Sequence, residues 1–108
     1  MDERDHDYDL RQLALLEAQL SQFESGQIQL AYLIRGLDAL LNCLRTVDQG
    51  WKGTFKSEWW TLEQVYAVAL DRKTNPLSPE NLPMVNGAVQ ALKRLVAEQR
   101  QKLELHNI

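Results

Sequence analysis

The sequence predicts an all-helical fold, an antiparallel bundle of four helices. Apolar residues recur every three or four positions in four separate stretches, which is the period of amphipathic helices. Short segments that contain glycine or proline join these stretches, and no alternating apolar pattern indicates a strand. Because the chain has 108 residues, the length of one domain, the four helices are expected to pack together as antiparallel neighbours.

The first helix is expected over residues 9–24. Its apolar face consists of Leu10, Leu13, Leu16, Leu20 and Phe23. Asp9 can cap its amino end, and Gly26 can end it in the left-handed conformation. Residues 1–8 are acidic and are expected to form a flexible segment, so the bundle domain is predicted to comprise residues 9–108.

The second helix is expected over residues 27–47. Its apolar stripe consists of Leu30, Leu33, Ile34, Leu37, Leu40, Leu41 and Leu44. Gly36 lies within this helix, where the missing side chain can permit close approach of a neighbouring helix. Cys43 is expected to be partly buried and unreactive, as isolated cysteines usually are.

The third helix is expected over residues 50–72, with Asp48 as its cap. Its predicted core face consists of Trp51, Phe55, Trp59, Leu62, Tyr66 and Leu70. Pro76 and Pro79 interrupt the helical pattern, and the fourth helix is expected over residues 79–104. Its predicted inward side chains are Met84, Val85, Ala88, Leu92, Leu95, Val96 and Leu103.

Charge is distributed unevenly along the chain. The net charge is −3, but residues 1–9 hold five of the fifteen acidic residues and one of the twelve basic residues, which leaves the remainder nearly neutral. A basic cluster at Lys93, Arg94, Arg100 and Lys102 is offset by Glu98 and Glu104. Direct binding of nucleic acid is therefore not expected.

Several features favour a cytoplasmic protein that does not bind membranes. No apolar window reaches the roughly 20 residues of a membrane span. The acidic start is unlike the basic start of a signal peptide. The single cysteine, Cys43, cannot form an internal disulfide, which fits a reducing compartment.

Residues for catalysis or metal binding are scarce. The two histidines are His6 and His106, near opposite ends of the chain and far in sequence from Cys43. Neither a zinc site nor a nucleophile with its base is therefore predicted. Glu58, Glu63 and Asp71 have spacings that are common on solvated helix faces. We expect no enzyme, no cofactor and no metal.

Trp60 is the local feature that points most clearly to binding. Successive helical residues are about 100° apart, so Trp60 points sideways or outward if Trp59 faces the core. Trp60 then aligns with Lys56, Gln64, Ala67 and Asp71, with Glu63 at the border. Two interpretations stay open: Trp60 packs under a neighbouring helix or loop, or it is a binding residue on an exposed face.

One string of residues resembles a known family. The matching positions are Phe23, Glu24, Ser25, Gly26, Gln27 and Ile28, followed by Asp48, Trp51, Phe55, Trp59, Leu62, Glu63, Tyr66 and Ala67. Over residues 20–96 the chain resembles the small helical immunity proteins of bacterial contact-dependent growth inhibition systems. The most specific part is the segment from Trp59 to Ala67.

The resemblance implies a cytoplasmic inhibitor that binds its cognate toxin C-terminal domain one-to-one. That toxin is often a nuclease, and the inhibitor would cover its active site or its nucleic-acid groove. The partner-binding residues expected from this hypothesis are Trp60, Glu63, Gln64, Asp71 and Asp38. The free protein is expected to be a monomer. The alternative is a helical adaptor or regulatory subunit, including one that associates with itself.

Overall fold

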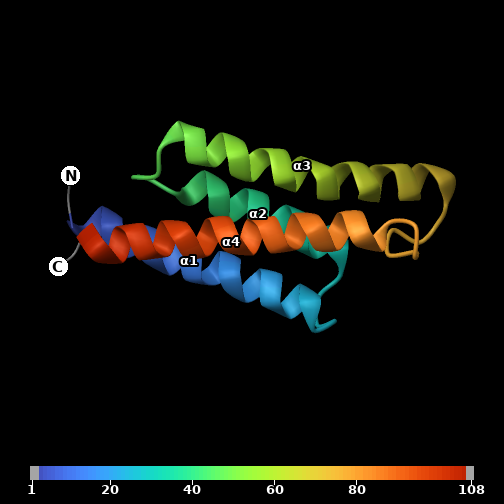
Figure 1. The fold of residues 1–108 in the computed structure, drawn as a ribbon, viewed down its shortest axis with the longest axis horizontal. Coiled ribbons are helices and arrows are strands. Elements are labelled where there is room, and N and C mark those ends of the chain that lie inside the picture. The colour runs from blue at the N-terminus through green and yellow to red at the C-terminus, as the bar shows by residue number, and fades with distance from the viewer. Residues whose placement is uncertain (1–2, 107–108) are drawn as a thin grey trace.

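The computed structural model describes residues 3–106 and contains four helices and no strand within them. They are α1 (Glu3–Glu24), α2 (Leu30–Cys43), α3 (Gln49–Arg72) and α4 (Leu82–His106). α1 packs against α2 and α4, and α3 packs against the same two helices, so the four form a closed ring with successive helices antiparallel (Figure 1). The predicted all-α bundle is confirmed.

The bundle is elongated, with extents of 48 × 25 × 18 Å, and its helices differ in length. α2 has 14 residues, whereas α3 and α4 have 24 and 25. The carboxyl end of α3 and the amino end of α4 consequently extend past α1 and α2, on the right of Figure 1. At this end of the molecule, which we call the loop end, the 25–29 and 73–81 connections meet.

The core lies along the bundle axis and contains most of the apolar residues predicted to face inward. Leu13, Leu16 and Leu20 of α1, Leu33 and Leu37 of α2, Phe55 and Leu62 of α3, and Val85, Leu92 and Val96 of α4 are fully buried. Partly buried side chains, including Leu10, Phe23, Trp51, Trp59, Tyr66 and Leu95, surround them. Burial of these apolar faces is the main stabilisation of such a bundle.

Two of the predicted inward positions were wrong. Leu70 is 66% exposed and Met84 is 56% exposed, both on the part of the molecule that extends past α2. In α3 the core face continues instead through Val65 and Ala69. Seven residues after Leu62 a helix returns almost to the same side, whereas eight residues carry the chain about 80° away.

The amino-terminal prediction also needs correction, because α1 begins at Glu3 rather than at residue 9. Asp9 is therefore not a helix cap. Its buried carboxylate accepts hydrogen bonds from the backbone N–H groups of Arg45 (2.9 Å) and Thr46 (2.7 Å) and from the Thr46 hydroxyl (2.6 Å). A buried charge requires such partners, so Asp9 fastens α1 to the α2–α3 connection.

The acidic segment was expected to be flexible, but its residues 3–8 continue α1, while residues 1–2 lie outside the described part. Arg45 holds the segment from the other side. Its guanidinium lies 4.0 Å from the centre of the Tyr8 ring and 3.2 Å from the Asp5 carboxylate. These contacts with the α2–α3 connection explain why the helix extends through an acidic sequence.

α2 is shorter than the predicted range of 27–47 at both ends. It stops at Cys43 because the next N–H groups, those of Arg45 and Thr46, turn to Asp9. At Gly36 the neighbour is the end of the Gln19 side chain of α1, whose Cδ would lie 2.7 Å from an added Cβ, so the glycine makes room for a side chain rather than for a close helix backbone. Cys43 was predicted to be partly buried and is exposed.

The predicted ends of α3 are close to those observed. Its cap is Asp48, which accepts a 2.7 Å hydrogen bond from the Trp51 N–H. α4 begins at Leu82 rather than at residue 79. The carbonyl of Ser78 accepts bonds from the N–H groups of Asn81 and Leu82, which closes a turn before the helix. Gly26 has the expected left-handed conformation, with φ of 80°.

Candidate binding face on helix α3

The two adjacent tryptophans of α3 lie in different environments. The indole N–H of Trp59 donates a 2.7 Å hydrogen bond to the carbonyl of Ile34, and its ring packs against the core. Trp60 is 53% exposed, and its indole N–H has no hydrogen-bond partner among residues 3–106. The structure therefore places Trp60 on an exposed face, the second of the two positions that the sequence left open.

Four of the five residues predicted to bind a partner lie on one side of α3. Gln64 and Asp71 are exposed along the same line as Trp60, and Glu63 is half-buried beside it. Helical geometry places this line opposite the core-facing side of α3. We call Trp60, Glu63, Gln64 and Asp71 the outer α3 face.

Asp38, the fifth predicted residue, does not belong to this face. It is on α2, and its carboxylate forms an ion pair with Lys56 of α3. The Lys56 ammonium also lies 4.1 Å from the centre of the Trp59 ring. Asp38 therefore helps to join α2 to α3 and already has an internal partner.

A hollow that the sequence did not predict borders the outer α3 face. It has a volume of about 240 Å³ and is lined by Thr61, Gln64, Val65, Val68, Asn81 and Met84. Gln64 belongs to both features, so the hollow and the face are continuous. Val68 and Met84 are about half exposed here, which gives the hollow an apolar wall. The size and the lining suit one apolar side chain of a partner.

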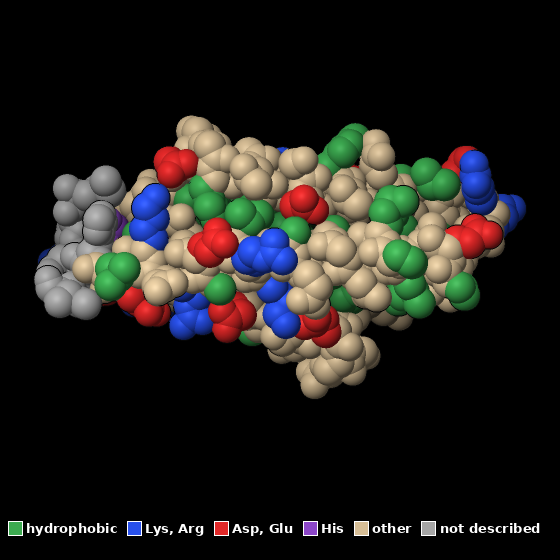
Figure 2. Space-filling view, viewed as in Figure 1, with side chains coloured by type: hydrophobic (Ala, Val, Ile, Leu, Met, Phe, Trp, Pro, Cys, Tyr) green, Lys and Arg blue, Asp and Glu red, His purple; other side chains and the backbone are tan. Residues whose placement is uncertain are grey.

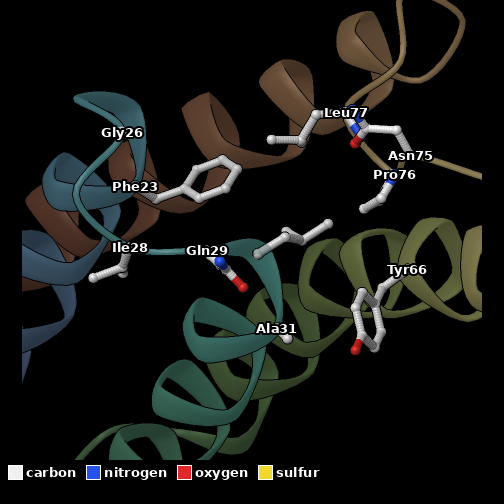
Figure 3. Close-up of a pocket in the computed structure, with 10 residues that line it drawn as sticks. Phe23, Gly26, Ile28, Gln29, Ala31, Tyr66, Asn75, Pro76 and Leu77 are labelled. Atoms are coloured by element: carbon white, nitrogen blue, oxygen red, sulfur yellow. The ribbon is translucent and has the colours of Figure 1, made fainter.

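Two further hollows lie at the loop end. One has a volume of about 380 Å³, and Figure 3 shows Phe23 of α1, Tyr66 of α3 and Leu77 of the 73–81 connection around it. The other, of about 540 Å³, shares Phe23 and Leu77 and extends toward Leu82 and Asn86. Both exist because α2 is short and leaves the space between the two connections partly open.

The surface changes character along the molecule. In Figure 2, hydrophobic side chains gather toward the loop end, with basic and acidic side chains at its tip, whereas acidic and basic side chains alternate over the other half. The large apolar side chains exposed in this region are Val68, Leu70, Leu77, Leu82 and Met84. An apolar concentration of this kind is typical of a surface that contacts another protein.

Two of the four residues in the basic cluster of α4 form ion pairs with α1. The Lys93 ammonium lies 2.6 Å from the Glu24 carboxylate, and the Arg100 guanidinium lies 2.9 Å from that of Glu17. The hydrogen bond from Lys93 lowers the pKa of Glu24 below its ordinary value, and a bond from Gln90 adds to this. These pairs join α1 to α4, whereas Arg94 and Lys102 of the same cluster are exposed.

Among the described side chains, those of residues 4–105, no three His, Cys, Asp or Glu gather as they would around a metal ion. A hydrogen bond with Cys43 raises the pKa of the Tyr8 hydroxyl, and this pair links α1 to the end of α2.

Among the described residues, no helix combines the length and hydropathy of a membrane span.

Comparison of the chain with known proteins gave no match among protein-family models, curated proteins or solved structures.

Proposed function

We propose that this chain is an immunity protein, a helical inhibitor that binds a cognate toxin domain one-to-one and blocks its active site or its nucleic-acid groove. The observation that carries the proposal is the exposed Trp60 of the outer α3 face. This indole lies outside the core cluster and donates no hydrogen bond within the described residues. Exposed tryptophans are among the strongest anchors of protein interfaces.

The surroundings of Trp60 support the same proposal. The hollow between α3 and α4 lies within reach of a partner that covers Trp60, and it offers an apolar receptacle next to a polar rim. Glu63 and Asp71 make no ion pair with other described residues. Two unpaired carboxylates on one face would attract the basic surface with which a nuclease holds nucleic acid.

The test is growth protection. The toxin domain encoded beside this chain is expressed in a sensitive bacterium with and without the chain. We expect the wild-type chain to restore growth, and Trp60→Ala to lose most of that protection at an equal level of soluble protein. Glu98→Gln is the matched control, because Glu98 is exposed on α4, away from the outer α3 face. This variant should protect as wild type does. Failure of the wild-type chain to protect would refute the proposal.

A second candidate, a self-associating adaptor, is favoured by the loop end. Its exposed leucines and hollows could be covered by a second copy of the chain. Light scattering separates the two functions, because the immunity protein is expected to be a monomer when free. A stable dimer that is lost on substituting Leu77 or Leu82 with serine would favour the adaptor.

A further inference from the structure

Twice among the described residues, an aromatic ring, a cation and a carboxylate form a connected group across two segments. The Arg45 guanidinium lies over the Tyr8 ring at 4.0 Å and pairs with Asp5 at 3.2 Å. The Lys56 ammonium lies over the Trp59 ring at 4.1 Å and pairs with Asp38. In each case the cation comes from a different segment than the carboxylate and is held by both a ring face and a negative charge.

A third ring and carboxylate are present on the outer α3 face. Trp60 and Glu63 are three residues apart in α3, a spacing that makes side chains neighbours on a helix. No cation among the described residues lies over the Trp60 ring or pairs with Glu63. The nearest basic residue along this side, Lys56, is already held by Asp38 and Trp59.

We infer that Trp60 and Glu63 form a slot for an arginine side chain of a protein partner. A planar guanidinium can stack on the indole and donate to the carboxylate at the same time, which a lysine ammonium does less well. The partner's chemistry follows from charge complementarity, because Glu63 and Asp71 are the unpaired charges of this face. Asp71, about 16 Å from Trp60 along the helix, would take a second cation. This inference rests on the proposed function only in placing the partner on the same face.

The slot can be tested without the toxin. The probe is a blocked helical peptide of alanine and glutamine that carries two arginines on one side, about three turns apart to match Trp60 and Asp71. The readout is the set of three indole N–H signals in the NMR spectrum of the full chain, in which the Trp60 signal is identified by its loss in Trp60→Phe. We expect the Trp60 signal to shift and saturate, while the signals of Trp51 and Trp59, whose N–H groups bond to backbone carbonyls, stay in place.

Two matched comparisons decide the outcome. The same peptide with citrulline, which has the shape of arginine without its charge, should leave the Trp60 signal unchanged. Glu63→Gln should weaken binding of the arginine peptide roughly threefold to fivefold, whereas Glu98→Gln, which removes the same charge on α4, should not. Equal shifts with both peptides, no shift at all, or equal weakening by the two variants would overturn the inference.

The result is separable from that of the growth test. A slot that binds the arginine peptide in a chain that gives no protection would contradict the immunity function and leave the slot standing. Protection by a chain whose Trp60 signal does not respond to the arginine peptide would support the immunity function and contradict the slot.

Discussion

The inner and outer sides of α3 differ in what the fold requires of them. On the inner side, Phe55 and Leu62 are fully buried, and Trp59 donates its N–H to α2. On the outer side, Trp60 carries the same type of ring as Trp59 yet is half exposed and makes no hydrogen bond with the described residues. Residue type alone therefore does not determine the role of a side chain in α3. Packing explains Trp59, whereas for Trp60 we propose a role in binding.

The largest expected effect is on the inner side. Phe55→Ala removes a fully buried ring from the centre of the bundle and should lower the free energy of unfolding by about 3–5 kcal/mol. Urea unfolding followed by circular dichroism measures this loss. A loss below about 1 kcal/mol would show that the inner side of α3 is not packed as described.

The same contrast between a buried and an exposed side chain applies to two carboxylates of α1, those of Asp9 and Asp7. Asp9→Ala leaves two backbone N–H groups and a hydroxyl in the α2–α3 connection without their acceptor, which should cost about 2–4 kcal/mol of unfolding free energy. Asp7→Ala, an exposed carboxylate of the same helix, should change it by less than about 0.5 kcal/mol. Equal losses from the two variants would contradict the role assigned to Asp9.

The adjacent tryptophans give the sharpest contrast in stability. Trp60→Ala should lower the free energy of unfolding by no more than about 1 kcal/mol, because about half of its side chain is solvated and it makes no hydrogen bond with the described residues. Trp59→Ala should cost at least about 2 kcal/mol, since it loses core packing and the bond to Ile34. The same urea titration compares both, and a reversed order would place the wrong tryptophan on the surface.

The smallest effect concerns the Glu24–Lys93 ion pair. Its two side chains are partly exposed, Glu24 at 34% and Lys93 at 35%. Because folding lowers the pKa of Glu24, its stabilisation is present above the ordinary value of 4.5 and disappears as the pH falls through the lowered value. At pH 7, Glu24→Gln should cost a few tenths of a kcal/mol. The difference from wild type should vanish at pH values well below 4.5, and a difference that grew on acidification would contradict the pairing.

The sequence could predict what depends on neighbours in the chain. Asp48 as the cap of α3 follows from local capping chemistry, and the outward direction of Trp60 follows from its angle to Trp59. The partners of Asp9 could not be predicted, because they lie 36 and 37 residues away and become neighbours only after folding. The carboxylate therefore resembled a helix cap rather than a buried anchor.

Features at the ends of the bundle could also not be predicted from local sequence patterns. Periodicity alone made Leu70 and Met84 core residues, but both are exposed where the shorter α2 no longer covers α3 and α4. The hollow beside Gln64 escaped prediction for a related reason, since it is lined by α3, α4 and the turn before α4 together. The outer α3 face was predictable because it belongs to a single helix.

We propose that the outer α3 face binds the partner, and one calorimetric comparison is the strictest check of this proposal. The proposed toxin partner is titrated with wild type and with Trp60→Ala. We predict that Trp60→Ala weakens binding by about 30-fold or more while its thermal unfolding midpoint stays close to that of wild type. Equal affinity of the two proteins for the toxin domain would contradict the claim.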